Sequence, residues 1–181
     1  LILRRFDRTP ENNRHPYLSA MSMLGASENE THSYMEIADL LARYGAQPAD
    51  DRRQLWRRMV FNVLISNTDD HLRNHGFLYR HGRGWALAPA FDLNPRPIDL
   101  NPRVLNTTIG LDDPSASLDL ALENAAYFDL DAHEARTIAR EVADATAMWH
   151  KEAENIGLTR HQIERMVTAF EHADSSRARA L

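Results

Sequence analysis

The sequence of 181 residues contains no cysteine and a single lysine, Lys151. Without cysteine, neither disulfide bonds nor thiolate chemistry can stabilise the fold or carry out a reaction, which suits a reducing compartment. No apolar run approaches the roughly 20 residues that a membrane-spanning helix requires. We therefore expect a cytoplasmic protein that does not enter a membrane.

Basic charge is also scarce, because 21 Lys and Arg residues stand against 26 Asp and Glu residues and give a net charge of −5. This balance disfavours broad, nonspecific binding to nucleic acid, although a local basic patch stays compatible with it. The hydrophobic fraction of 43% is ordinary for a globular protein. A chain of this length can bury one sizeable core, so the sequence predicts one domain.

Helical patterns dominate the chain. Ser33 and Glu36 form a capping box that opens a helix, Gly45 ends this helix, and Pro48 opens the next helix, which ends around Ser66. Apolar spacing predicts further helical segments over 17–26, 117–128, 131–157 and 159–173. We expect a linker over 27–32, irregular structure over 93–114 and a frayed tail over 174–181.

One β-hairpin interrupts the helices, because "HGFLYR" (75–80) and "GWALAP" (84–89) flank the turn "HGRG". The chain also begins with Leu1-Ile2-Leu3, which is typical of a strand and needs a partner. We interpret the chain as a piece of a longer protein. The predicted fold class is mainly α, a helical bundle with one hairpin.

Polar side chains gather where the helix over 48–66 meets the hairpin, and a further acid follows the hairpin directly behind Phe91. They are Asn67, Thr68, Asp69, Asp70, His71, Asn74 and Asp92. Phosphoryl transfer needs one carboxylate for the attacking hydroxyl, and an amide oxygen and a second carboxylate to hold magnesium against the phosphates. Asp69 and Asn74 have the Asp-x-x-x-x-Asn separation of a kinase catalytic loop. The order Asp, Asn, hairpin, aromatic-Asp predicts Asp69 as the catalytic residue, with Asn74 and Asp92 as metal ligands.

Two other interpretations concern the acids themselves. The short polar side chains could simply satisfy the helix end and the turn, although this leaves Phe91 and Asp92 unexplained. Asp70 is a rival for the catalytic role, but its separation from Asn74 is one residue too short.

The histidines and tryptophans allow further alternatives. A zinc site is conceivable at His71, His75 and His81, but two of these flank a predicted strand and no cysteine assists. Tryptophans can serve as stacking platforms, but core positions are favoured for Trp56, Trp85 and Trp149.

The pattern Asp69-x-His71-x-x-Asn74 resembles the catalytic loop of phosphatidylinositol-type kinases rather than the His-Arg-Asp order of ordinary eukaryotic protein kinases. Longer segments resemble the C-terminal part of the HipA family: "LILRRFDR", "YLSAMSMLGA", "SYMEIADLLARYGAQP", "LWRRMVFNVLISNTDDHLRNHGFL" and "GWALAPAFDLNP". The resemblance runs from residue 1 to about residue 170, and its most specific part is 58–95.

This resemblance implies a protein-kinase-like C-terminal lobe of a bacterial serine/threonine kinase, the toxin of a type II toxin–antitoxin module. It implies ATP and Mg²⁺ as cofactors, with Asp69 as the catalytic aspartate and Asn74 and Asp92 as magnesium ligands. The nucleotide would contact these two ligands and a further set of residues: Arg4, Arg5, Phe6, His71 and Phe91.

The resemblance also implies partners and a division of the chain. The family's best-known protein substrate is glutamyl-tRNA synthetase, and its kinases bind a HipB-like helix-turn-helix antitoxin that holds operator DNA. Residues 1–8 would be the hinge strand that ends an N-terminal lobe, and 9–181 would be the C-terminal lobe. A phosphate-binding loop and a nucleotide-binding lysine would precede Leu1, so we expect the chain alone to be inactive.

Two other functions stay open. A small-molecule kinase of the aminoglycoside phosphotransferase type also spaces Asp and Asn by five, but it usually has His-Gly-Asp where Asn67-Thr68 precedes Asp69 here. A non-catalytic scaffold for antitoxin or DNA complexes is the second alternative, although Asp69, Asn74 and Asp92 are all present.

Overall fold

The computed structural model describes residues 5–27, 30–98, 102–111 and 113–181 of the chain. In chain order its elements are β1 (Tyr17–Ser19), α1 (Ala20–Leu24), β2 (His32–Ser33), α2 (Tyr34–Tyr44), α3 (Pro48–Leu64), η1 (Leu72–Asn74), β3 (Gly76–Arg80), β4 (Gly84–Leu87), β5 (Thr107–Thr108), α4 (Leu118–Glu123), η2 (Ala125–Phe128), α5 (Ala132–Ala147), α6 (Trp149–Asn155), α7 (Arg160–Phe170) and α8 (Ala173–Arg179). The mainly helical class predicted from the sequence is confirmed.

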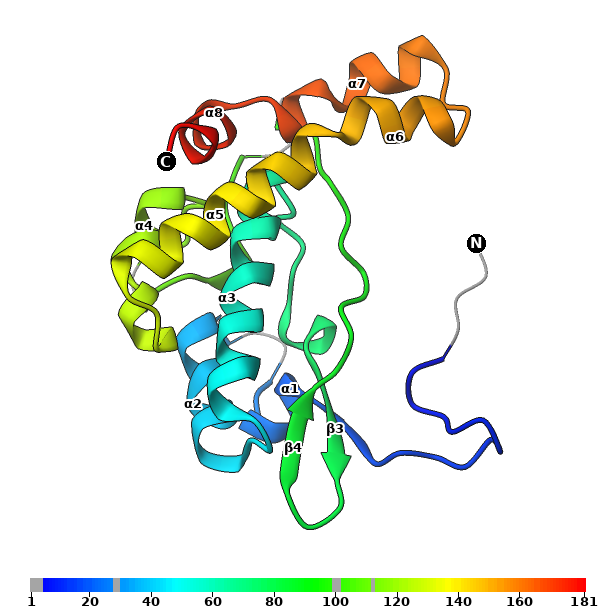
Figure 1. Ribbon diagram of the computed structural model, residues 1–181, viewed down its shortest axis with the longest axis vertical. Coiled ribbons are helices and arrows are strands. Elements are labelled where there is room, and N and C mark those ends of the chain that lie inside the picture. Colours follow the sequence, from blue (N-terminus) through cyan, green and yellow to red (C-terminus); the bar gives the residue numbers. More distant parts are fainter. Residues whose placement is uncertain (1–4, 28–29, 99–101, 112) are drawn as a thin grey trace.

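Helix α3 lies at the centre of the core, with α2 and α5 packed against it (Figure 1). The Trp56 indole N–H donates a hydrogen bond of 3.1 Å to the carbonyl of Ala121. The fully buried apolar residues of α3 are Leu55, Trp56, Met59, Val60, Val63 and Leu64. Trp56 is therefore a core residue, as predicted, whereas Trp85 and Trp149 are only partly buried.

The starts of the central helices follow the predicted signals. The Ser33 hydroxyl accepts a hydrogen bond from the Glu36 backbone N–H, and the Glu36 carboxylate accepts one of 2.7 Å from the Ser33 N–H. Helix α3 starts at Pro48, whose missing N–H has no helical partner to lose at this position.

The predicted hairpin is present as β3 and β4, and β1 adds a third antiparallel strand in the order β1-β3-β4. The segment over 17–26 was predicted to be helical throughout, which is wrong for Tyr17–Ser19 because these residues pair with β3. The Ala46 N–H donates a hydrogen bond of 2.8 Å to the Trp85 carbonyl, so the hairpin is also tied to the end of α2.

A second, smaller sheet was not predicted. Strand β2 pairs in parallel with β5. This pairing connects the end of the expected linker over 27–32 with the segment over 93–114, which was expected to be irregular. Two residues are too few to show the alternation by which a strand is found in a sequence.

The C-terminal helices differ from the prediction in two ways. The long helix expected over 131–157 is divided at Met148 into α5 and α6, and this bend lets Trp149 stack on Phe170 of α7 at 4.7 Å between ring centroids. Helices α6 and α7 project from the end of the molecule opposite β3 and β4 (Figure 1). The tail expected to be frayed forms α8, in which Ala178 is fully buried.

Helix α8 is anchored to the centre of the fold by Arg103. This guanidinium donates one hydrogen bond of 2.8 Å to the Val63 carbonyl and another to the Asp174 carboxylate. The other Asp174 oxygen accepts a hydrogen bond of 3.1 Å from the Leu118 N–H.

The hinge strand expected over 1–8 lies half outside the described residues. Within 5–8, one isolated antiparallel bridge joins Arg8 to Arg14, so the hinge assignment stays a prediction. None of the helices in the described part of the chain has both the length and the apolar character needed to cross a membrane.

Candidate active site

The loop that carries the predicted catalytic residue follows the end of α3. Ser66 adopts a left-handed backbone conformation with a φ of 54°, which turns the chain away from the helix axis. From Asn62 to Asp70 every residue is buried except Asp69. The loop therefore presents one exposed carboxylate from a buried frame.

The Asp69 carboxylate is held from two sides. Its Oδ2 accepts a hydrogen bond of 2.7 Å from Arg96, and its Oδ1 accepts one of 3.3 Å from the Asn106 side-chain amide. About half of the Asp69 side chain, 51%, stays exposed. The carboxylate is thus oriented yet accessible to a substrate.

Asp70, the rival for the catalytic role, occupies a different environment. Only 1% of the residue is exposed, and its Oδ2 accepts hydrogen bonds from the Tyr34 hydroxyl and, at 2.8 Å, from His75 Nε2. Burial alone would raise the pKa of Asp70, but the charge of His75 and the two hydrogen bonds outweigh it and lower this pKa. Asp70 is therefore an internal ionic group.

A chain of buried hydrogen bonds leads to Asp70. The Asn67 side-chain amide donates to Asn62 Oδ1 at 3.0 Å, and the Asn62 amide donates to the Tyr34 hydroxyl at 2.9 Å. Burial and the Asp70 carboxylate raise the pKa of Tyr34 well above its ordinary value, so the Tyr34 hydroxyl keeps its proton and donates to Asp70. We call this set of five residues the buried relay: Asn67, Asn62, Tyr34, Asp70 and His75.

Sequence reasoning missed the buried relay. Tyr34 is the N-terminal residue of α2 and Asn62 lies near the end of α3, so the two come together only through the packing of those helices. The unusual polarity of Asn62 on an otherwise apolar helix face is the one signal that the sequence offers.

His71 precedes the short helix η1, and Asn74 is its last residue. The Asn74 N–H donates a hydrogen bond of 2.8 Å to the His71 carbonyl, and the Asn74 side chain is buried. The His71 Nδ1 atom is buried without a hydrogen-bond partner among the described residues. The other two histidines of the alternative zinc site have different neighbours: His75 pairs with Asp70, and His81 packs edge-on against Tyr79. In the described part of the chain, no three His, Asp or Glu side chains are arranged to hold a metal ion.

The segment with Phe91 and Asp92 faces the N-terminal part of the chain. The Phe91 ring stacks on Phe6 with centroids 5.7 Å apart. Asp92 is exposed, has a left-handed φ of 58° and accepts a hydrogen bond of 2.7 Å from the Asn94 amide. Such a φ is uncommon outside glycine and is found where a short polar side chain bonds locally.

The other predicted nucleotide contacts are only partly described. Arg5 is exposed and pairs with Asp7 at 2.7 Å, and Arg4 lies outside the described residues. No hydrogen bond or ion pair found among the described residues joins the side chains of Asp69, Asn74 and Asp92. Their convergence on one magnesium ion stays a prediction.

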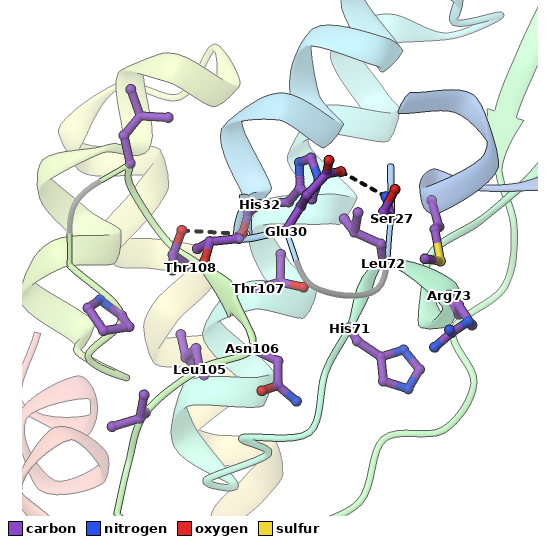
Figure 2. Close-up of a pocket in the computed structure, with 15 residues that line it drawn as sticks. Ser27, Glu30, His32, His71, Leu72, Arg73, Leu105, Asn106, Thr107 and Thr108 are labelled. Carbon is purple, nitrogen blue, oxygen red and sulfur yellow. Dashed lines mark hydrogen bonds and ion pairs between the residues drawn. The ribbon is translucent and has the colours of Figure 1, made fainter. Parts of the chain in front are cut away.

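A cleft of about 560 Å³ opens next to the loop that follows α3 (Figure 2). His71 and Arg73 lie on one side of it and Asn106 on the other, and the residues of β5 form part of its wall. Because Asn106 also bonds to Asp69, the carboxylate of Asp69 lies beside this cleft.

The chain belongs to the family described as HipA-like C-terminal domain, whose sequence model matches residues 1–150. The segments that suggested this family from the sequence lie within or overlap the matched range. The family assignment made from the sequence is confirmed.

Curated relatives share part of the chain. A protein of Haemophilus influenzae named "Putative kinase" is 26% identical over 117 residues, 60% of this chain and 34% of the relative. "Putative kinase Y4dM" of Sinorhizobium fredii is 34% identical over 96 residues, 51% of this chain and 23% of the relative. The chain thus spans about a third or less of the length of these relatives.

A solved structure shares the fold. The complex of HipA, HipB and operator DNA from Shewanella oneidensis contains a chain that matches with a TM-score of 0.69 at 18% identity. The match covers 97% of this chain and 46% of that one. At this identity the likeness establishes the fold and nothing further.

Proposed function

We propose that this chain is the C-terminal lobe of a serine/threonine protein kinase that transfers the γ-phosphoryl group of ATP to a protein hydroxyl. The observation that carries the proposal is the exposed Asp69 carboxylate, held by Arg96 and Asn106 above a buried frame. A residue that meets the substrate hydroxyl has to be accessible and oriented at the same time. The family's likeness to proteins named as kinases supports this assignment.

Asp69 is proposed to orient the acceptor hydroxyl and to take its proton. The hydroxyl oxygen bonds to the γ-phosphorus, the bond from that phosphorus to the bridging oxygen breaks, and ADP leaves with the bond's electron pair. The buried Asp70 cannot meet a hydroxyl in solution and is proposed to fix the loop instead. This division of roles explains two adjacent aspartates with opposite exposure.

Asn74 and Asp92 are proposed to hold magnesium. Their amide and carboxylate oxygens are the hard donors that this ion prefers, and Mg²⁺ bound with a nucleotide uses only one or two carboxylates, completed by phosphate oxygens and water. The donor set therefore fits the ion without a cluster of three acids. When bound, magnesium neutralises charge on the phosphates.

Nucleotide contacts are proposed for His71 and for the stacked pair of Phe6 and Phe91. His71, two residues after Asp69, lies in the wall of the cleft, and its Nδ1 atom has no hydrogen-bond partner among the described residues. The stack places Phe6 against the segment that carries Asp92. Arg4 and Arg5 precede Phe6 in the proposed hinge and are proposed as further nucleotide contacts.

Partners are proposed from the family likeness. The Shewanella HipA was solved with HipB and operator DNA. We propose that the parent of this chain, acting in the cytoplasm, likewise binds a HipB-like antitoxin and reaches DNA through it. Glutamyl-tRNA synthetase is its proposed protein substrate.

The Asp69→Asn variant of the full-length parent tests the proposal. We expect phosphotransfer to fall by at least about 1,000-fold, since the variant keeps the shape of the side chain and removes the proton acceptor. Asp144→Asn is the matched control, because Asp144 is exposed on α5 and far from the loop in sequence. Unchanged transfer of ³²P from ATP by the Asp69 variant would refute the assigned role.

Unfolding free energies of both variants complete the test. Each should lie within about 1 kcal/mol of the wild type, because both aspartates are exposed. A loss of activity that accompanied unfolding would show a structural role for Asp69 instead.

A further inference from the structure

The cleft beside Asp69 contains an apolar surface to which the proposed chemistry assigns no task. Val104 and Leu111 line this cleft and are 49% and 69% exposed. A single exposed aliphatic side chain is common on protein surfaces. Two of them on the wall of one cleft, which also contains the Asp69 partner Asn106, form a candidate subsite.

The segment that carries Val104 is firmly held. The Leu105 N–H donates a hydrogen bond of 2.7 Å to the Pro114 carbonyl, and the Ala116 N–H donates one of 2.9 Å to the Arg103 carbonyl. The Arg103 side chain is itself fixed to the Val63 carbonyl and to Asp174. The backbone beside Val104 is thus tied to the core, so this part of the apolar wall is preformed.

Asp69 lies between this cleft and the segment that carries Asp92, and His71 in the wall of the cleft is proposed to meet the phosphate end of the nucleotide. The Oδ2 atom of Asp69 bonds to Arg96, which follows Asp92 in the chain, and its Oδ1 bonds to Asn106 in the wall of the cleft. In phosphoryl transfer the attacking and leaving oxygens are roughly in line, so donor and acceptor approach the phosphorus from opposite sides. With the nucleotide on the Asp92 side, the cleft is the open approach for the acceptor.

We infer that the cleft is the acceptor site of the kinase and that Val104 and Leu111 select a polypeptide segment with an aliphatic side chain close to its serine or threonine. The inference rests on the proposed function. The acceptor hydroxyl lies at Asp69, which takes its proton as the phosphoryl group arrives, and the neighbouring aliphatic side chain packs on Val104 and Leu111.

The charges of the cleft disfavour a cationic sugar as the acceptor. Glu30 is the one acidic residue among the described residues of the wall, and its carboxylate already accepts a hydrogen bond of 2.7 Å from the Ser27 N–H and pairs with His32 at 3.5 Å. An aminoglycoside needs several free carboxylates around it. The cleft instead offers aliphatic surface, and its volume is within the usual range of about 300–1,000 Å³ for ligand sites.

Degenerate peptide libraries test the inference with the full-length parent. Each library has a central Ser or Thr and one fixed flanking residue, and phosphate transfer from ³²P-ATP is measured. We expect the wild type to select an aliphatic residue at one flanking position. We expect Val104→Glu and Leu111→Glu to lower kcat/KM for that peptide by about 10-fold or more and to select Lys or Arg there instead.

The matched control is Ile156→Glu, because Ile156 is 75% exposed and lies at the end of α6, outside the cleft. This variant should keep the wild-type selection. Mg–ATP affinity, measured by calorimetry, should stay within about twofold in all three variants, which separates acceptor selection from nucleotide binding and from misfolding.

The outcomes distinguish the two proposals. Peptide phosphorylation whose selection is the same in the wild type and in both cleft variants would overturn the acceptor site and leave the kinase assignment standing. Phosphorylation of amino sugars but of no peptide would also overturn it. A wild type that transfers phosphate to no acceptor would overturn the kinase assignment and, with it, this inference.

Discussion

Asp69 and Asp70 are adjacent in the chain, yet one is exposed and the other is internal. The Asp70 carboxylate is buried beside His75 and Tyr34, where its charge has no access to water. Removing one member of such a buried pair leaves the other buried without a partner. The resulting loss of folding stability is larger than the loss on removing an exposed ion. The same substitution at the two positions should therefore have very different effects.

We predict that Asp70→Ala lowers the free energy of unfolding by about 3–5 kcal/mol, whereas Asp69→Ala changes it by less than about 1 kcal/mol. Urea denaturation of the two variants and the wild type measures the difference. Equal effects at both positions would contradict the structural role given to Asp70. Tyr34→Phe, which removes only the hydroxyl that donates to Asp70, should have an intermediate effect of about 1–3 kcal/mol.

The candidate site could be predicted from the sequence only where residue spacing carries the signal. Asp69, Asn74 and Asp92 were predicted from their order along the chain, and their joint role stays a prediction. The pairing of Asp70 with Tyr34 joins residues 36 positions apart and depends on how α2 packs against α3. The sequence around Asp69 and Asp70 does not indicate which of the two side chains is exposed. Tertiary packing determines that Asp69 is exposed and Asp70 is buried.

At the scale of elements, the turn between β3 and β4 offers a direct comparison of two glycines. Gly82 and Gly84 both have positive φ, 71° and 108°. A Cβ at Gly82 would meet nothing within 4 Å, whereas a Cβ at Gly84 would lie 2.5 Å from the Tyr44 carbonyl oxygen at the end of α2. Gly84 thus permits the hairpin to approach α2.

We predict that Gly84→Ala destabilises the protein by about 2–4 kcal/mol, combining backbone strain with a clash against main-chain atoms. Gly82→Ala should cost about 1 kcal/mol, because only the unfavourable φ contributes. Thermal unfolding of both variants tests the order of the two effects. A larger loss at Gly82 would show that the hairpin does not pack against α2 as described.

Helix α8 depends on a histidine at its start. His172 Nε2 lies 3.1 Å from the Leu64 carbonyl, at the end of α3. Burial, with a smaller contribution from the positive charge of Arg103, lowers the pKa of His172, although the hydrogen bond to the Leu64 carbonyl and the charge of Asp174 partly oppose this. A histidine whose pKa is lower in the folded state stabilises the fold above its ordinary pKa of about 6.5 and loses that contribution as the pH falls through its lowered value.

We predict that acidification from pH 7.5 to 5.5 weakens the attachment of α8 to α3. Hydrogen exchange of the α8 amides, corrected for the intrinsic dependence on pH, should show lower protection at pH 5.5. His172→Asn removes the titrating group and should flatten this dependence. His150→Asn is the control, because His150 is exposed and pairs with Glu171. An identical loss of pH dependence in this control would show that His172 is not the group responsible.

Helix boundaries were predictable where the signal is local. Thr159 and Gln162 form a capping box within four residues, and α7 begins there as expected. Helix α8 was expected to be frayed because its anchor, the pair of Arg103 and Asp174, joins residues 71 positions apart. Strands β2 and β5 were missed for the same reason, since each is defined only by its distant partner.

At the scale of the whole molecule, the chain spans 46% of the Shewanella HipA chain that it matches. Its single lysine, Lys151, lies on α6, which projects from the end opposite β3 and β4 (Figure 1). Lys151 is not among the described residues that line the cleft beside Asp69. We expect a complete nucleotide site to need further protein groups that grip the phosphates.

We predict that the 181-residue chain binds Mg–ATP no more tightly than about 1 mM, or about −4 kcal/mol. Carboxylates open to water bind magnesium and nucleotide weakly, because the solvent screens their charge. Isothermal titration calorimetry with the chain alone measures this affinity, and the full-length parent is the reference. A micromolar dissociation constant for the chain alone would show that it holds a nearly complete nucleotide site.

The placement of α8 has a practical consequence for anyone who wishes to produce this domain. The family match ends at residue 150, but Ser175 and Ala178 are buried and Asp174 holds the guanidinium of Arg103. A recombinant fragment cut at residue 150 would expose the apolar residues of α5 that α8 covers. Arg103 would also lose its partner Asp174. The unit that folds extends through α8, so the boundary of shared sequence is a poor guide to where this domain can be cut.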